Sequence, residues 1–319
     1  MRPDDDTYGR SELSGKSLDQ ARAMYENAYN GDDFKVELTD QTFAYRYTAA
    51  GNADMTLRSS TFLGTVEGSI QPQGEYVAMW MTEGHGTVDV GGSDTEAELG
   101  RPAMFPTGKL FAFEMNEFKQ NLVHFRAGYL EQIAAEHEGA LAGPLTFDHT
   151  ARLDDATLAS WKQTITTVAK TVLTPVAPSV LMQAEVTRLA AVALLDTFPH
   201  EVIGYDSVLL APRNARLRSA VEYIHAQARL PLTATDIAAQ AGLSPRGLQQ
   251  AFSTQLGSTP MNYLRRVRLD YVRAELQNLH PDHVTVAEVA QRWGFIHLGR
   301  FSAAYVDKFG EYPSDTLRS

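Results

Sequence analysis

The sequence predicts an α+β protein with a β-rich N-terminal part and an all-helical C-terminal part. Between Phe34 and Phe125, short apolar runs are separated by Gly, Pro, Asn and Asp, which is typical of a sandwich or barrel of short strands. From Leu217 onward, apolar residues recur at helical spacing instead. The length of 319 residues agrees with two domains, because a domain holds about 150 residues.

Several of the predicted strands are rich in aromatic and β-branched residues, as strands tend to be. Gly91 and Gly92 are expected to form a hairpin turn between two of these strands. The strands are expected at residues 35–38, 41–47, 55–57, 61–66, 76–81, 87–90, 97–99, 110–115 and 121–125.

Three helices are predicted after the strands. The first covers 129–137, and the second begins at the pair Asp154 and Asp155, because carboxylates favour helix N-termini. Ser179 is expected to cap the third, which runs to Phe198 and has apolar residues on more than one face. The chain is thereby divided into a mobile arm (1–30), a β-rich domain with its helices (31–200), a linker (201–214) and a helical domain (215–319).

Composition excludes several kinds of site. Cysteine is absent, so disulfides, thiolate metal sites and a cysteine nucleophile are excluded. No run approaches the ~18 apolar residues of a membrane span, and the acidic start of the chain lacks the apolar core of a secretory signal. We therefore expect a cytoplasmic protein that has no membrane partner.

The net charge of -11 argues against nucleic acid as a partner, because phosphate binding needs positive surface. The charge is unevenly distributed, however. Residues 211–319 hold 13 basic and 9 acidic residues, and 12 of those 13 cations are Arg, whereas residues 1–210 hold 15 basic and 30 acidic residues. Such asymmetry suggests a nucleic-acid module joined to an acidic partner domain.

Two segments of the helical domain have the pattern of a helix-turn-helix. In the first, a short helix ends at Gly242, Ser244 caps the next helix, and Pro245 takes its first position. In the second, Trp293-Gly294-Phe295 forms the turn. The second helix of each unit buries residues at four-residue spacing, namely Leu248, Phe252 and Leu256, and then Phe301, Tyr305 and Phe309.

A helix over about 260–277 connects the two units, and it would span ~26 Å at ~1.5 Å per residue. Two recognition helices held by such a rod could enter successive major grooves, which recur every ~34 Å. Double-stranded DNA is therefore the expected partner, with two adjacent major grooves contacted per subunit.

The helical domain strongly resembles the AraC/XylS family of transcription regulators, and its turn at 293–301 resembles the XylS-type branch. The resemblance covers about one third of the chain and is specific, because both units match in order. The residues that carry it lie in the segments 236–252, 256–269, 286–290, 293–301 and 309–313.

The resemblance implies which residues read DNA: Arg246, Gly247, Gln249, Gln250, Arg268, His297, Leu298, Gly299, Arg300 and Ala303. Gln pairs bidentately with adenine and Arg with guanine, which agrees with this assignment. Many family members have Arg in place of Gln250 and Ala303, so base preference does not carry over. Exposed Arg and Gln are ordinarily solvated surface, His297 could instead cap its helix, and the family suggests that Arg268 also braces the two units.

The resemblance also implies a cupin-like barrel that binds a small effector, followed by helices that form a homodimer, and RNA polymerase as a further partner. The polar and aromatic residues that could line an effector pocket are Tyr45, Arg46, Tyr47, Trp80 and His85. Core or surface packing is the alternative explanation for each of them singly. If the XylS-type resemblance extends to the ligand, an aromatic acid is expected, with Arg46 as the partner of its carboxylate.

No metal site, cofactor or catalytic machinery is expected. His85 and His124 are about forty residues apart, without the His-x-His pair of a metal-binding cupin. No Gly-x-Ser-x-Gly elbow appears. The leading interpretation is an effector-controlled DNA-binding regulator, more often an activator in this family. Two alternatives are a ligand-independent regulator whose barrel serves only dimerisation, and an enzyme fused to a DNA-binding domain.

Overall fold

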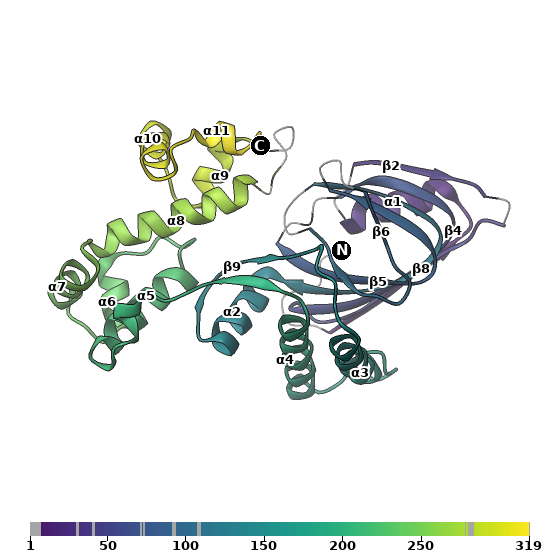
Figure 1. The fold of residues 1–319 in the computed structure, drawn as a ribbon, viewed down its shortest axis with the longest axis horizontal. Coiled ribbons are helices and arrows are strands. Elements are labelled where there is room, and N and C mark those ends of the chain that lie inside the picture. The colour runs from purple at the N-terminus through teal and green to yellow at the C-terminus, as the bar shows by residue number, and fades with distance from the viewer. Residues whose placement is uncertain are drawn as a thin grey trace. The chain divides into compact units, whose positions relative to one another are not determined.

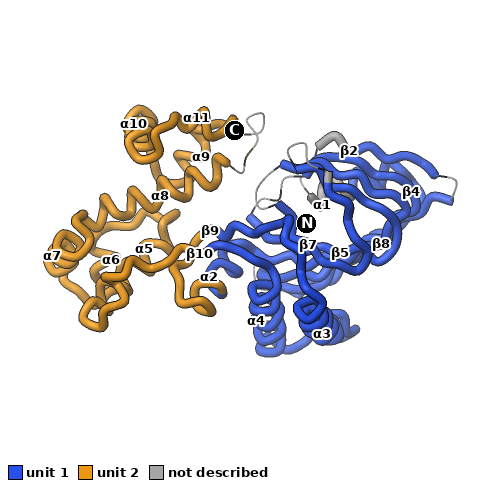
Figure 2. The backbone as a smooth tube through the Cα atoms, in the orientation of Figure 1, with its two compact units in different colours: residues 1–133, 145–201 blue, residues 134–144, 202–319 orange. Residues whose placement is uncertain are grey.

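The computed structural model describes residues 8–29, 32–39, 42–70, 72, 74–90, 94–106, 110–277, 279 and 284–318. The chain forms two compact units (Figure 2). Unit 1 consists of residues 1–133 and 145–201, and unit 2 consists of residues 134–144 and 202–319.

Unit 1 is built on an antiparallel sheet that has eight strands in the described part of the chain, in the order β1-β3-β4-β8-β5-β6, with β2 on β4 and β7 on β5. Its strands curve around a common interior (Figure 1), as expected for a cupin-like barrel. The strands are β1 (Gly9–Gly15), β2 (Asp32–Glu37), β3 (Tyr45–Gly51), β4 (Met55–Ile70), β5 (Glu75–Asp89), β6 (Asp94–Glu96), β7 (Ala103–Met104) and β8 (Phe111–Arg126).

The predicted short strands are fewer and longer in the structure, because β4, β5 and β8 each join two of them. The break expected around Glu83 is a β-bulge rather than a turn, whereas residues 58–60 pair with β8 in regular register. A further register shift lies between Phe62 and Thr65, inside a segment that was predicted as strand. Gly84 has φ of +90°, and a Cβ there would lie 2.5 Å from the Glu117 carbonyl oxygen. The predicted hairpin turn at Gly91 and Gly92 lies outside the described residues.

The core of unit 1 lies on the concave side of this sheet. Burial alternates along β4 and β8, so one set of side chains faces inward. Phe62 stacks on Phe118 with ring centroids 5.8 Å apart, and Phe43 meets Phe62 edge-on at 5.3 Å. The period-two pattern of the sequence therefore produces an aromatic core on this side of the sheet.

Helices α3 (Asp155–Val172) and α4 (Val180–Thr197) pack against each other (Figure 1). Their predicted starts are confirmed, because Asp154 accepts a hydrogen bond from the Thr157 amide at 2.8 Å and Ser179 caps α4. The buried Trp161 anchors α3 to the sheet through an edge-on contact with Trp80 at 6.2 Å.

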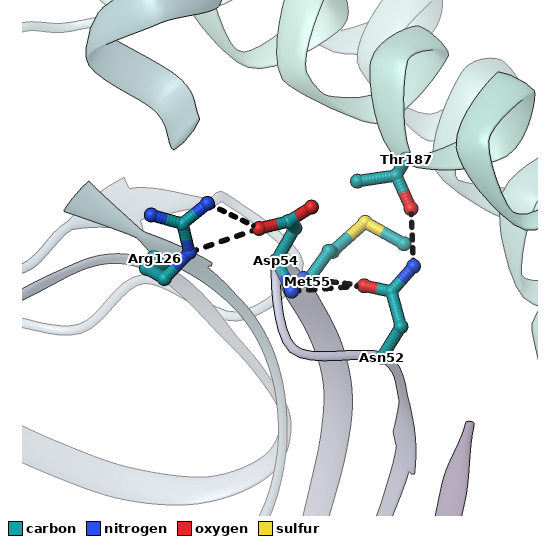
Figure 3. A network of polar contacts seen from close by, with 5 residues as sticks. All are labelled: Asn52, Asp54, Met55, Arg126 and Thr187. Carbon is teal, nitrogen blue, oxygen red and sulfur yellow. Dashed lines mark hydrogen bonds and ion pairs between the residues drawn. The ribbon is translucent and has the colours of Figure 1, made fainter. Parts of the chain in front are cut away.

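A polar network holds α4 on the sheet (Figure 3). Asn52, in the turn between β3 and β4, donates a hydrogen bond to the Thr187 hydroxyl of α4 at 3.2 Å. Its carbonyl oxygen accepts from the amides of Asp54 and Met55 at 3.0 and 2.9 Å. Arg126 at the end of β8 donates twice to the Asp54 carboxylate, at 2.9 and 2.6 Å. The turn is thereby fixed to both the helix and the neighbouring strand.

The prediction of a mobile arm over residues 1–30 is wrong for residues 9–29. Strand β1 pairs with β3 along its whole length, and α1 (Leu18–Tyr29) buries Ala21 and Met24. The side chains of β1 are mostly exposed, so its pairing depends on backbone hydrogen bonds that composition does not reveal. Residues 1–7 lie outside the described part of the chain.

The predicted linker 201–214 is also structured. Strands β9 (Leu141–Phe147) and β10 (His200–Ile203) pair with each other, and two short 3-10 helices follow at Ser207–Leu210 and Pro212–Asn214. Leu141 and Leu209 are buried in the core of unit 2. The domain boundary therefore falls earlier than residue 215, because residues from before the predicted linker complete this core.

Unit 2 contains two hydrophobic clusters that share one helix, α8. Leu264 and Tyr271 of α8 belong to the first cluster, and Leu269 and Leu276 belong to the second. The helices are α5 (Ala215–Ala226), α6 (Ala234–Gln240), α7 (Pro245–Leu256), α8 (Pro260–Gln277), α9 (Val286–Arg292), α10 (Leu298–Phe309) and α11 (Pro313–Thr316). Helix α2 (Ala127–Glu138) begins in unit 1 and ends in unit 2.

Candidate nucleic-acid interface

The first helix-turn-helix consists of α6 and α7. A capping box starts α6, since Thr233 accepts from the Asp236 amide at 3.3 Å while Asp236 accepts from the Thr233 amide at 2.8 Å. The turn passes through Gly242 at φ of +62°, a conformation that glycine adopts without strain. Ser244 then caps α7 by accepting from the Gly247 amide at 3.1 Å.

Helix α7 presents the predicted contact residues on its outer face. Leu248 and Phe252 are fully buried, whereas Arg246, Gln249 and Gln250 are exposed and Gly247 is half-buried. Gln250 donates to the Thr254 hydroxyl at 2.9 Å, which holds its amide along the helix. The structure therefore brings these predicted contacts together on one accessible face.

The second unit, α9 and α10, repeats this design. Thr285 and Glu288 form the same capping box, with amide-to-side-chain distances of 2.7 and 3.2 Å. The turn contains Gly294 at φ of +79°. Phe301 and Tyr305 are buried, as the four-residue spacing predicts.

The outer face of α10 differs in chemistry from that of α7. His297, Gly299, Arg300 and Ala303 are exposed, so the predicted contacts again lie on one face. His297 occupies the N-cap position but its side chain accepts no capping hydrogen bond. The neighbouring Ile296 is 83% exposed, a position that the sequence patterns did not single out, and such an apolar group can contact a thymine methyl.

Helix α8 braces the two helix-turn-helix units, chiefly through Arg268. Its guanidinium donates to the carbonyl oxygens of Ala228 at 2.7 Å and Leu230 at 2.6 Å, which lie just after α5. The same group lies against Gly294, where a Cβ would sit 3.0 Å from a guanidinium nitrogen. Burial lowers the pKa of Arg268. Among the arginines predicted to contact DNA, Arg268 is thus the one whose donors are engaged within the described part of the protein.

Trp293 completes the junction between the two clusters. It stacks on Tyr271 with ring centroids 4.7 Å apart, and its indole N–H donates to Glu275. The Tyr271 hydroxyl donates to the carbonyl oxygens of Ala142 and His225 at 3.0 and 3.2 Å. The stack therefore links the second turn to both α5 and the 134–144 segment within unit 2.

Other cations of α8 also serve the fold. Arg265 donates to the carbonyl oxygen of Arg300 at 3.1 Å, and Arg273 pairs with Glu311 at 3.0 Å. Within the described part of the chain, the side chains of Arg246 and Arg300 make no hydrogen bond or ion pair. These two guanidiniums keep all their donors available for an external partner.

The predicted effector residues of unit 1 do not form one site. Tyr45 and Tyr47 are buried in the core of the sheet, whereas Arg46 points to the other face of β3, is 62% exposed and pairs with Glu12 at 2.9 Å. Trp80 packs outward against Trp161, and His85 is exposed. The suggestion that Arg46 binds a carboxylate inside the barrel is wrong, because successive side chains of a strand face opposite sides.

The inward face of the sheet holds a polar cluster that sequence analysis missed. His124 on β8 contacts Glu75 at 3.0 Å, and Arg58 on β4 contacts the same carboxylate at 3.5 Å. Burial and the neighbouring Arg58 lower the pKa of His124. For Glu75, burial acts to raise the pKa, but His124 and Arg58 outweigh it and the pKa is lowered. Only the sheet register, which places Arg58 opposite Leu122, brings these residues together.

A small cavity lies further along the same inward face. It is lined by Ile70, Phe105, Phe111, Phe113, Met115 and Phe118, and Gln120 of β8 supplies a polar group.

No cluster of potential metal ligands occurs among the described residues, and no described helix is both long and apolar enough to cross a membrane.

Comparisons with known proteins agree with this division. Residues 37–196 match an AraC-binding-like domain and residues 237–319 match a helix-turn-helix domain. The probable thc operon regulatory protein of Rhodococcus erythropolis is 28% identical over 313 residues, covering 95% of this chain and 93% of that protein. XylDLEGF operon transcriptional activator 2 of Pseudomonas putida is 36% identical over 137 residues, covering 43% of this chain and 85% of that protein.

Among solved structures, the AraC-like transcriptional activator CuxR is similar with a TM-score of 0.44 and 18% identity, over 83% of this chain and 96% of that one. The fold, the exposed helices and the matched domains define a DNA-binding transcription regulator with a ligand-binding-like domain, and not an enzyme. The chain belongs to the AraC/XylS family.

Proposed function

We propose that this protein is a sequence-specific transcription activator, that a small molecule bound in the barrel of unit 1 controls it, and that it acts in the cytoplasm as a homodimer. The observation that carries the proposal is the pair of capped helix-turn-helix units on one rod, each with an exposed polar face. In this proposal Arg246, Gln249 and Gln250 read one major groove. His297, Gly299 and Arg300 read the next, and Arg268 supports both by bracing the junction.

The modest charge of the helical part supports base reading over bulk attraction. Residues 211–319 carry a net charge of only +4, whereas non-specific binding depends on neutralising many phosphates. The free donors of Arg246 and Arg300 suit bidentate recognition of guanine. Two groove contacts per subunit and two subunits would then supply the affinity.

Exposed apolar side chains on unit 1 support dimerisation. Val180 and Leu181 at the start of α4 are 81% and 73% exposed, and Leu189 is exposed eight residues after Leu181, on the same helix face. Large exposed apolar patches mark interaction sites, and a second copy of the same helix would cover this one by two-fold symmetry.

The dimer is tested by the mass of the protein in solution. Leu181→Glu should convert a dimer into a monomer, because it buries a charge at the proposed contact. Leu210→Glu, at another exposed leucine in unit 2, is the matched control and should leave the mass unchanged. A monomeric wild-type protein at micromolar concentration would contradict this part of the proposal.

Footprinting on promoter DNA tests the groove assignment. We expect two protected stretches on one face of the duplex, about 34 Å apart. Arg246→Ala and Arg300→Ala should each remove one stretch and lower affinity by about 1–3 kcal/mol, whereas the exposed Arg318→Ala should have little effect. Full affinity in both variants, with folding intact, would show that these helices do not read DNA.

Activation itself is tested by transcription with purified RNA polymerase. The transcript level from a bound promoter should rise when the protein is added, and the Arg246→Ala variant should not produce this rise. A fall in transcript level would identify a repressor instead.

A further inference from the structure

The cavity of unit 1 is apolar and aromatic except at one point. Phe111, Phe113 and Phe118 lie on β8 and point inward beside Met115. Aromatic rings prefer offset or edge-on contacts with other rings. A ring-containing ligand would therefore find matching surfaces on several sides of this cavity.

Gln120 is the exception. Its side chain is 7% exposed, and the sheet register places it between Ser60 of β4 and Met81 of β5, both fully buried. Within the described residues its amide group makes no side-chain hydrogen bond. A primary amide carries two donors and an acceptor. The Gln120 amide is not among the fully buried, unpartnered side-chain groups of the described residues, so it remains accessible from the cavity. The cavity therefore holds a polar group that a ligand could satisfy.

Charge on the inward face is already balanced. None of the described residues lining the cavity is charged. Further along this face, Arg58 lies opposite Leu122, and its guanidinium pairs with Glu75 and also donates to the Thr56 hydroxyl at 3.0 Å. A carboxylate ligand would gain no free cation from these groups and would meet the charge of Glu75. An uncharged ligand avoids both penalties.

The size of the cavity sets a further condition. Its volume is about 20 Å³, so a ring enters only when lining side chains move. Met115 can move readily because its side chain is unbranched and has three rotatable bonds. It also lies against Gly86, where a Cβ would sit 2.1 Å from the Met115 sulfur.

We propose that this cavity is a site for an uncharged, ring-containing ligand whose polar group hydrogen-bonds to Gln120. The inference deepens the proposed effector control and rests on it. The ligand moves Met115 and fills the space that its side chain leaves. The aromatic acid expected from the sequence is replaced by a neutral aromatic compound.

Calorimetric titration of the full chain with three probes of similar size tests the ligand class. Benzamide should bind, toluene should bind more weakly because it cannot pair with Gln120, and benzoate should bind at least about tenfold more weakly than benzamide, which corresponds to ~1.4 kcal/mol. Benzoate binding as tightly as benzamide would overturn the proposal, and so would the absence of benzamide binding at millimolar concentrations.

Gln120→Leu tests the polar contact. It should weaken benzamide binding at least about tenfold while leaving toluene binding equal or stronger. It should also raise the melting temperature of the free protein, because an amide without partners becomes an apolar group of similar shape. A purely structural Gln120 would instead lower the melting temperature when replaced. Gln163→Leu on the exposed face of α3 is the matched control for both measurements and should change neither benzamide affinity nor the melting temperature.

DNA affinity measured with and without benzamide separates this inference from the proposed function. Benzamide binding that leaves DNA affinity unchanged supports the site and contradicts effector control through it. Benzoate that binds and changes DNA affinity supports effector control and overturns the ligand class. Unchanged benzamide affinity in Gln120→Leu overturns the role of Gln120 whatever the effect on DNA.

Discussion

The two helix-turn-helix units start alike and differ where the second helix of each begins. Both have a Thr capping box and a turn glycine at positive φ. Helix α7 then begins with a Ser244 side-chain cap and Pro245, whereas α10 begins at His297 without a side-chain cap and next to the exposed Ile296. The start of α7, the second helix of the first helix-turn-helix unit, is therefore determined by residues of its own segment.

The second recognition helix depends more on its neighbours. Arg265 of α8 donates to the Arg300 carbonyl, and Lys308 pairs with Asp270 of α8 at 2.6 Å. Trp293 and the Arg268 guanidinium hold its turn against the first unit. The comparison shows that two copies of one motif can be stabilised by different means, one through caps and the other through tertiary contacts.

The largest expected effect comes from removing the shared tryptophan. Trp293→Ala should cost about 3–5 kcal/mol of unfolding free energy, because Trp293 packs against both clusters and stacks on Tyr271. Urea denaturation measures the loss, with the exposed Tyr312→Ala as control. A loss of unfolding free energy no larger than that of the control would mean that the two hydrophobic clusters of unit 2 are not joined through Trp293.

The next effect is a pH dependence located in the first cluster. Burial, with a smaller contribution from Lys308, lowers the pKa of His225 from 6.5 to about 4. The folded state favours the neutral ring, so its contribution to stability is complete above pH 6.5 and is lost as pH falls towards 4. The loss is roughly 3 kcal/mol.

Urea denaturation across this range should show the decline. Because carboxylates titrate in the same range, the decisive quantity is the difference from His225→Gln, which should have a flatter profile. Parallel profiles for the two proteins would rule His225 out as the cause.

A smaller loss is expected from the brace. Arg268→Met leaves the carbonyl oxygens of Ala228 and Leu230 without this donor and should cost about 1–3 kcal/mol. Affinity for a DNA site that spans two major grooves should also fall, because the two helix-turn-helix units are no longer held at a fixed distance from each other. The exposed neighbour Arg266→Met is the control. Loss of DNA affinity without loss of stability would instead indicate that Arg268 contacts DNA directly.

The smallest effects test the caps themselves. Ser244→Ala should cost ~1 kcal/mol, whereas His297→Ser should gain up to ~1 kcal/mol, because it supplies the side-chain cap that α10 lacks. Thermal unfolding of the two variants measures both signs. If both variants lowered the melting temperature, or both raised it, the two helix starts would not differ in capping as the structure indicates.

Local signals predicted much of unit 2. Caps such as Ser244 and the four-residue spacing of Leu248 and Phe252 act within one or two helical turns, so one sequence reveals them. The exposed polar faces of α7 and α10 could be anticipated for the same reason, whereas their predicted contacts with DNA came from the resemblance to the family. The partners of Arg268 could not, because it donates to carbonyl oxygens about 40 residues away, and any residue supplies a carbonyl.

Unit 1 was less predictable because its contacts are non-local. The bulge near Glu83 resembles a turn in sequence, and the edge strand β1 resembles a polar arm. The candidate effector residues were chosen by residue type, whereas alternation along β3 sends Arg46 away from Tyr45 and Tyr47. Strand register, which aligns residues far apart in the chain, decides which side chains meet.

The amino-acid sequence by itself determined the two-part organisation and the capped helices of unit 2, because these depend on composition and short-range spacing. Its motifs also carried the resemblance that indicated the family. Only the tertiary structure decided which cations remain free to contact DNA, that Leu141 and Leu209 complete the core of unit 2, and that Gln120 faces an aromatic cavity. These features depend on packing between distant segments, and a single sequence does not specify such packing residue by residue.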